Sequence, residues 1–143
     1  MRRLFELVRR QTRRGYAIAS PGDVAALLRN RGRPEVENLW LVSVNGAHEV
    51  SNVHHIGMGL ADAVLVHPRE IFAPAICDRA VGIFLAHNHP SGNLKPSLTD
   101  HSVTQRVRQS GEIVGIELID HVIFSDDAYF SFAEHNQLSI GEC

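Results

Sequence analysis

The chain has 143 residues, of which 44% are hydrophobic and 21% charged, and its formal net charge is −2. This size and composition are typical of one globular domain that buries a core. The small net charge excludes a strong overall attraction to nucleic acid.

Cysteine content and hydropathy bear on the compartment. The two cysteines, Cys77 and Cys143, are far apart in sequence, which excludes a disulfide framework and favours a reducing cytoplasm. Apolar runs are too short to span a membrane, so we expect no membrane association. The N-terminus is basic, but no apolar core follows it, so we expect no secretory signal.

Residues 1–19 are expected to form a basic N-terminal arm that precedes the domain at residues 20–143. Six arginines in the arm surround Leu4, Leu7 and Val8, which would form one apolar stripe of a short helix. Such an arm could bind DNA or an acidic partner, or it could be a solvated terminus. Six arginines alone are a weak sign of nucleic-acid binding, so the solvated terminus is favoured.

A helix is predicted to begin at Ser20. Ser20 is the expected N-cap, Pro21 the first helical residue, and Asp23 completes a capping box. The sequence Arg31-Gly32-Arg33-Pro34 ends this helix. A strand follows at residues 39–44, which are rich in β-forming side chains.

The rest of the chain predicts further strands and helices. Asn45-Gly46 is typical of a type I′ hairpin turn, so an antiparallel strand is expected to begin near His48. The run at 81–86 is entirely apolar, which indicates a strand buried on both faces. Other expected elements are a strand at 63–66, helices at 68–79 and 97–109, strands at 113–119, 121–124 and 129–132, and a turn at 126–127. Together they predict a mixed α/β or α+β domain with a central sheet flanked by helices.

Residues 86–100, AHNHPSGNLKPSLTD, contain the strongest candidate site. His87 and His89 point to the same face of an extended chain, so both imidazoles can reach one ion. Asp100 is a candidate third ligand, which would leave zinc one open position for water, although iron or manganese also suits this set. A plain turn followed by a capped helix is the alternative, because Ser97 and Asp100 also have the form of a capping box.

The spacing of this stretch resembles a known signature. His87-x-His89, seven residues, Ser97, two residues and Asp100 match the JAMM metalloprotease pattern at every defined position. The chain is more closely similar to RadC-like proteins, the bacterial branch with this domain, over residues 20–134. The segments that carry this resemblance are 67–70, 87–92, 96–97 and 120–121.

The resemblance implies a fold and a metal site. The expected fold is a JAMM/MPN-like α/β (α+β) domain with cytidine-deaminase-like layering, a RadC-like JAMM domain at residues 20–143. One zinc ion per chain would be bound by His87, His89 and Asp100. Glu37 would be the general acid/base, with Glu35 as the alternative, and Ser97 would donate a hydrogen bond to the oxyanion. The implied reaction is hydrolysis of a peptide or isopeptide bond in a peptide or protein substrate through a metal-activated water.

Two other classes of function are open. RadC-like proteins carry a DNA-repair label, so a DNA-associated accessory role, possible without catalysis, is the main alternative. We expect no room here for the helix-hairpin-helix segment that often precedes the domain, which weakens that alternative. A non-catalytic binding domain is the other class, and the intact motif positions argue against it. The sequence leaves the substrate and the oligomeric state open.

Several other polar residues are assigned lesser roles. Asn88 and Ser91 are expected to hold the loop, and Asp120 and His121 to play a structural role or to support the site. His54 and His55 are adjacent on a strand, so they cannot easily serve one ion. We expect His101 to point away from the site and Cys77 to be a buried helix residue.

Overall fold

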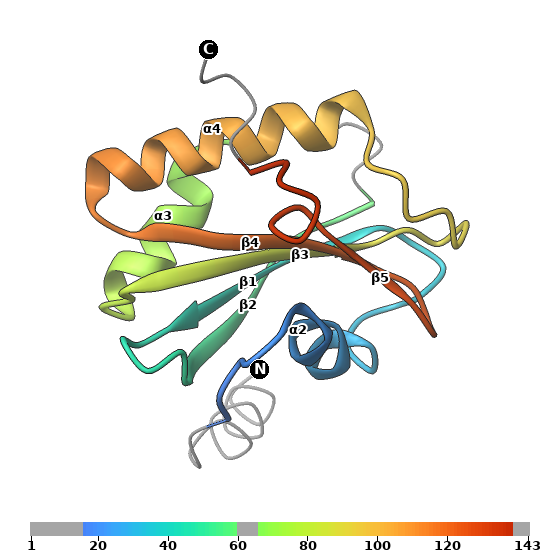
Figure 1. The fold of residues 1–143 in the computed structure, drawn as a ribbon, viewed down its shortest axis with the longest axis horizontal. Coiled ribbons are helices and arrows are strands. Elements are labelled where there is room, and N and C mark those ends of the chain that lie inside the picture. Colours follow the sequence, from blue (N-terminus) through green and yellow to red (C-terminus); the bar gives the residue numbers. More distant parts are fainter. Residues whose placement is uncertain (1–15, 60–65, 139–143) are drawn as a thin grey trace.

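The protein folds around one mixed β-sheet, with helices against both faces (Figure 1). The computed structural model describes residues 16–59 and 66–138. Within these ranges the sheet has five strands in the order β2-β1-β3-β4-β5. Their bounds are β1 Asn38–Val44, β2 Val50–Met58, β3 Gly82–Asn88, β4 Glu117–Phe124 and β5 Tyr129–Ser131, and the helices are α2 Pro21–Leu28, α3 Pro68–Cys77 and α4 Leu98–Val114. The predicted mixed sheet flanked by helices is confirmed.

The pairing of the central strand β3 determines which strand ends lie side by side. It pairs antiparallel with β1 and parallel with β4, and all of its residues are buried, as the apolar run predicts for residues 82–86; Val81 precedes the strand and is exposed. Because β1 runs in the opposite direction, its first residues lie beside the last residues of β3: Leu39 pairs with His87. The ends of β3 and β4 therefore share one edge of the sheet with the start of β1.

Side chains alternate between the two faces of the sheet. Helices α3 and α4 cover one face and α2 covers the other (Figure 1). The α3/α4 face buries Leu39, Leu41, Ile83 and Leu85, whereas the α2 face buries Trp40, Val42, Phe84 and Ala86. By the same alternation, His87 belongs to the face that α4 covers.

The N-terminus of α2 follows the predicted capping chemistry, and α3 begins at Pro68 as predicted. Asp23 Oδ2 accepts hydrogen bonds from the backbone N–H groups of Ser20 (3.1 Å) and Ala19 (2.8 Å). His67 precedes α3, and its Nδ1 accepts a hydrogen bond from the Arg69 N–H. Both helices therefore begin where the sequence predicts.

The hairpin between β1 and β2 is antiparallel as predicted, but the prediction of a type I′ turn is wrong. Val44 pairs with Val50, so the connection is a longer loop. Asn45 Oδ1 accepts hydrogen bonds from the N–H groups of Ala47 (2.9 Å) and Glu49 (3.0 Å). This side-chain turn replaces the two-residue turn. The left-handed residue is His48, with φ 58°, and not Gly46.

The predicted boundaries around residues 109–124 are also wrong. Helix α4 continues to Val114 and ends at Gly115, which adopts φ 77°. One strand, β4, replaces the two expected at 113–119 and 121–124. The β-branched Ile113 and Val114 suggest a strand locally, but both lie exposed on the last turn of α4.

Other expectations have mixed outcomes. Cys77 is exposed at the end of α3, so the prediction that it is buried is wrong. The predicted strand at 63–66 and the basic arm lie outside the described residues, except for Val66 and residues 16–19. None of the helices in residues 16–59 and 66–138 has the length and hydropathy needed to cross a membrane.

Candidate metal centre

Four side chains meet where β3 ends and β1 begins. Glu37 precedes β1, His87 lies in β3, His89 follows β3, and Asp100 is in the first turn of α4. One ligand atom from each lies within 4.8 Å of the others. The structure thus brings together the predicted ligands and the predicted general base. Glu35, the alternative base, is exposed and lies outside this cluster.

The distances test whether the donor set suits a small cation. His87 Nε2 lies 2.9 Å from His89 Nε2 and 3.3 Å from Asp100 Oδ1, and His89 Nε2 lies 3.4 Å from Asp100 Oδ2. Ligand atoms about 2.0–2.1 Å from a tetrahedral zinc ion are separated by roughly 3.3 Å. Glu37 Oε1 lies slightly further out, 3.8 Å from His87 Nε2. The two nitrogens and the carboxylate therefore fit one zinc-sized ion, with Glu37 beside it.

The capping box positions Asp100 within the cluster. Ser97 Oγ accepts a hydrogen bond from the Asp100 N–H (3.0 Å), and Asp100 Oδ2 accepts one from the Ser97 N–H (2.8 Å). Ser97 is exposed, whereas Asp100 is 4% exposed. The same carboxylate therefore caps α4 and contacts both histidines. The helix-cap interpretation and the ligand interpretation of this stretch are compatible.

A tight loop holds His89 after β3. The His89 N–H donates to the Phe124 carbonyl (3.2 Å), and His89 Nδ1 lies 2.6 Å from the Asn93 carbonyl oxygen. Ser91 Oγ accepts a hydrogen bond from the Asn93 N–H (3.3 Å), in the loop-holding role predicted for it. Gly92 adopts φ 78°, a conformation that favours glycine in this turn.

Asn88 holds the opposite side of the centre and not the loop, so that prediction is wrong. Its Oδ1 accepts a hydrogen bond from the Asn38 N–H (2.7 Å), and its Nδ2 donates to the Val36 carbonyl (2.8 Å). The Glu37 carbonyl in turn accepts a hydrogen bond from the Gly59 N–H (2.7 Å). The backbone is therefore fixed on both sides of Glu37 and at Glu37 itself.

The pKa values of the Glu37 and Asp100 carboxyl groups are shifted in opposite directions. Burial raises the pKa of Glu37, and the charges of His87 and His89 offset this only in part. Burial also acts to raise the pKa of Asp100, but hydrogen bonds with His87, His89 and Ser97 outweigh it and hold that pKa far below the usual range. Asp100 thus stays ionised, while Glu37 takes up a proton more readily than an ordinary glutamate. Such a divergence is typical of carboxylates with different roles.

The hydrogen bond with Asp100 also affects His89. That bond is the main cause that raises the pKa of His89, and the Asn93 carbonyl contributes in the same direction, whereas burial opposes it. Protons therefore compete for the His89 imidazole at a higher pH than for a free histidine.

His121 and Thr104 support the centre more directly than the sequence indicates. His121 Nε2 lies 2.8 Å from His87 Nδ1, and its Nδ1 lies 2.6 Å from Thr104 Oγ1. Thr104 Oγ1 donates to the Asp100 carbonyl (2.7 Å). Burial lowers the pKa of His121 well below that of a free imidazole. Thr104 follows Asp100 by one helical turn, and that spacing is a signal the sequence does contain.

The remaining polar residues take separate roles. Asp120 turns away from the centre and accepts hydrogen bonds from Ser131 and the Ala133 N–H, so of the two roles expected for it the structural one applies. As expected, the adjacent His54 and His55 do not serve one site: His54 contacts Asp78 and His55 contacts Asn38. His101 is not part of the metal-ligating cluster, and its ring packs against Phe132.

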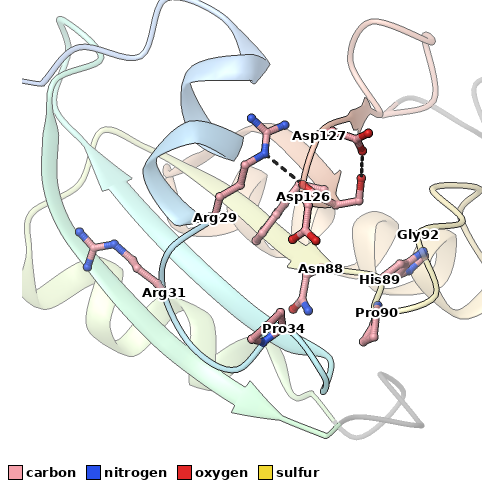
Figure 2. Close-up of a pocket in the computed structure, with 11 residues that line it drawn as sticks. Arg29, Arg31, Pro34, Asn88, His89, Pro90, Gly92, Asp126 and Asp127 are labelled. Carbon is pink, nitrogen blue, oxygen red and sulfur yellow. Dashed lines mark hydrogen bonds between the residues drawn. The ribbon is translucent and has the colours of Figure 1, made fainter.

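A cavity of about 190 Å³ borders the centre at His89. It lies between the end of α2 and the β4–β5 turn, and its walls carry Arg29, Arg31, Asp126 and Asp127 (Figure 2). Arg29 Nε donates to the Ser125 carbonyl (3.0 Å), and the carboxylate of Asp126 points toward Asn88. A polar space with charges of both signs is therefore available beside the candidate ligands.

A family model and individual relatives both match most of this chain. A family model described as RadC-like JAB domain matches residues 18–138. A UPF0758 protein of Rubrobacter xylanophilus is 47% identical over 122 residues, 85% of this chain and 53% of that protein. Another, of Trichlorobacter lovleyi, is 38% identical over 122 residues, again 85% of this chain and 53% of that protein. The chain thus spans about half the length of the curated relatives it matches.

Proposed function

The chain belongs to the RadC-like JAB domain family, and from this we propose that it is a zinc-dependent hydrolase that cleaves a peptide or isopeptide bond. We assign the activity to residues 20–143. The observation that carries the proposal is the spacing of His87, His89 and Asp100, with the Glu37 carboxyl beside them.

The donor set supports zinc as the ion. Two imidazole nitrogens and one carboxylate oxygen are a common ligand set of catalytic zinc sites, which keep one position open. When bound there, zinc would lower the pKa of a coordinated water toward neutrality and polarise the substrate carbonyl. Iron and manganese accept the same donors, so the choice among them is part of the test.

Glu37 is assigned the proton transfers. Its carboxylate accepts a proton from the attacking water and later delivers it to the leaving amine nitrogen. The pKa of this group is raised by burial, which suits proton transfer closer to neutral pH than an ordinary glutamate allows. Hydrogen bonds between the Asn88 side chain and the peptide groups on either side of Glu37 keep its backbone in place for both transfers.

Ser97 is assigned the stabilisation of the oxyanion. Its oxygen accepts the hydrogen bond from the Asp100 N–H, which leaves the hydroxyl hydrogen available for another acceptor. Ser97 is exposed next to Asp100, so a substrate carbonyl oxygen can approach it. A preorganised donor of this kind stabilises negative charge that develops in the transition state.

The proposal is tested with the purified full chain. Metal analysis is expected to find one zinc per chain, and a panel of peptide and isopeptide substrates is expected to be cleaved. A chelator should abolish cleavage and added zinc should restore it, while an Asp100→Asn chain should respond to neither. Absence of bound metal, or cleavage that survives the chelator, would overturn the proposal.

A parallel experiment addresses the DNA alternative. Labelled single- and double-stranded DNA are incubated with the zinc-loaded chain under the same conditions. We expect neither the single-stranded nor the double-stranded DNA to be cut. Cleavage of DNA together with intact peptides and isopeptides would replace the proposed function with a nucleic-acid role.

A further inference from the structure

The ring nitrogens of His121 connect one candidate ligand to another. Nε2 faces His87 Nδ1 at 2.8 Å, and Nδ1 faces Thr104 Oγ1 at 2.6 Å. Thr104 Oγ1 in turn reaches the backbone carbonyl of Asp100 at 2.7 Å. His121 is 1% exposed and Thr104 is 1% exposed, so water does not compete for these contacts.

The direction of each hydrogen bond follows from the bond between Thr104 and the Asp100 carbonyl. A carbonyl oxygen can only accept, so the single hydroxyl hydrogen of Thr104 is donated to Asp100. The short contact between Thr104 and His121 therefore requires a hydrogen on His121 Nδ1. A neutral imidazole has one N–H, so His121 Nε2 must accept a hydrogen from His87 Nδ1.

The consequence is a defined tautomer at His87. With its hydrogen on Nδ1, the neutral ring presents the Nε2 lone pair to Asp100 and His89. His89 also carries its hydrogen on Nδ1, but for a different reason: this nitrogen contacts the Asn93 carbonyl at 2.6 Å and must donate to it. With both rings neutral, two Nε2 lone pairs face each other at 2.9 Å, and a cation between them and Asp100 stabilises this arrangement in place of the proton that otherwise makes the hydrogen bond to Asp100.

We propose that His121 and Thr104 are positioning residues that hold His87 in the Nδ1–H tautomer and thereby give the centre its affinity for a metal ion. The inference deepens the proposed function and depends on it for the identity of the ion. Ligand histidines are commonly oriented by a carboxylate or a carbonyl. Here the partner is a second buried histidine, and its orientation is set by the backbone of another ligand, Asp100.

The tautomer itself is measured on the full wild-type chain without metal. Long-range ¹H–¹⁵N correlation spectra of ¹⁵N-histidine-labelled protein distinguish a protonated from an unprotonated ring nitrogen. We expect a hydrogen on Nδ1 of both His87 and His121, and none on Nε2 of His121. A His87 ring with a hydrogen on Nε2 and none on Nδ1 would overturn the inference whatever the activity of the chain.

Metal affinity is measured by competition between the protein and a zinc chelator in Thr104→Val and Thr104→Ser chains. Valine keeps the shape but loses the hydroxyl, and serine restores it. We expect Thr104→Val to bind zinc about tenfold to a hundredfold more weakly, as for other supporting partners of metal ligands, and Thr104→Ser to bind nearly as wild type. Equal affinity of the valine and serine chains would overturn the inference.

The two measurements separate the inference from the proposed function. If the wild-type chain binds no zinc, the proposed function fails, and the spectra still decide the tautomer of His87. If Thr104→Val does not fold, the wild-type spectra decide by themselves. If zinc binds normally but no amide is cleaved, the hydrolase proposal fails and the positioning role is retained.

Discussion

The side chain of Asn88, the last residue of β3, is hydrogen-bonded to the backbone N–H of Asn38, the first residue of β1, at 2.7 Å. The same amide donates to the Val36 carbonyl, so it spans the peptide groups on either side of Glu37. The strand that carries His87 therefore also sets the position of Glu37. The ligands and the proposed base cannot move independently.

Replacement of Asn88 should separate stability and catalysis from metal binding. In Asn88→Ala, the Asn38 N–H loses its acceptor and the Val36 carbonyl loses one of its two donors, which costs about 1–3 kcal/mol. We expect the hydrolysis rate to fall and zinc affinity to stay close to wild type, because the ligands are untouched. Denaturation, chelator competition and peptide assays measure the three effects. Asn30→Ala, at an exposed asparagine that follows α2, is the control, and a rate as low as that of Asn88→Ala would contradict the assignment.

Replacement of Glu37 tests the assignment of the base. Glu37→Gln keeps the shape but cannot accept a proton, so we expect a loss of about 10²–10⁴-fold in kcat with zinc still bound. The matched control is Glu35→Gln, because Glu35 is exposed outside the cluster. The readouts are kcat and the zinc content of each chain. Normal turnover by Glu37→Gln, or loss of turnover by Glu35→Gln, would show that the wrong glutamate is assigned.

Zinc affinity should depend on pH through His89. Its pKa is raised above the ordinary 6.5, chiefly by the hydrogen bond with Asp100. A protonated imidazole cannot bind the ion, so affinity is full above this raised pKa and falls as the pH drops through it. Asp100 adds nothing to this dependence, because its pKa is far below the usual range. Isothermal titration between pH 5 and 9 measures the effect, and constant affinity below pH 6 would be inconsistent with it.

Metal binding should stabilise the fold. Only the folded chain brings His87, His89 and Asp100 together, so zinc at a hundredfold excess over Kd adds about 2.7 kcal/mol to the free energy of unfolding. We expect a higher Tm with zinc in the wild-type chain and no change in Asp100→Asn. Magnesium, which prefers oxygen ligands, serves as the control ion. An equal shift with magnesium would indicate nonspecific binding.

Gly111, the glycine within α4, should not tolerate a larger side chain. A Cβ at this position would overlap the carbonyl oxygen of Ile116, where the chain turns from α4 into β4. Backbone cannot move aside cheaply, so Gly111→Ala should lose about 2 kcal/mol of stability despite the higher helix propensity of alanine. Gly46→Ala has open space around the new methyl group and should be nearly neutral. Chemical denaturation of both chains compares them, and equal stability would refute the close approach.

The sequence predicts the parts of the fold and site that depend on local spacing. His87 and His89 share a face because they alternate along an extended segment, and Ser97 fixes the first turn of α4. Glu37 is different, because its local sequence does not distinguish it from Glu35. The family resemblance favours Glu37. The structure places Glu37 in the cluster, where Asn88 bonds to the residues on either side of it and the Gly59 N–H bonds to its carbonyl.

The features that the sequence mispredicts or misses have physical causes. Asn45 can make a side-chain turn that competes with the type I′ hairpin, and the sequence does not say which is better. Ile113 and Val114 favour a strand locally, but the helix continues until Gly115 supplies a left-handed residue. The contact between His87 and His121 depends on the register of the parallel pair β3–β4, which no local pattern encodes.

The pairing of β1 with β3 joins two distant segments of the chain at the centre. Residues 87–100 carry all three candidate ligands, whereas Glu37 precedes β1 and is held beside them through a contact that spans 50 residues, between Asn38 and Asn88. The parts for metal binding and for proton transfer are therefore encoded in separate stretches of sequence. A substitution in one stretch can remove its own function and leave the other, so a descendant of this chain could keep the ion and lose the chemistry.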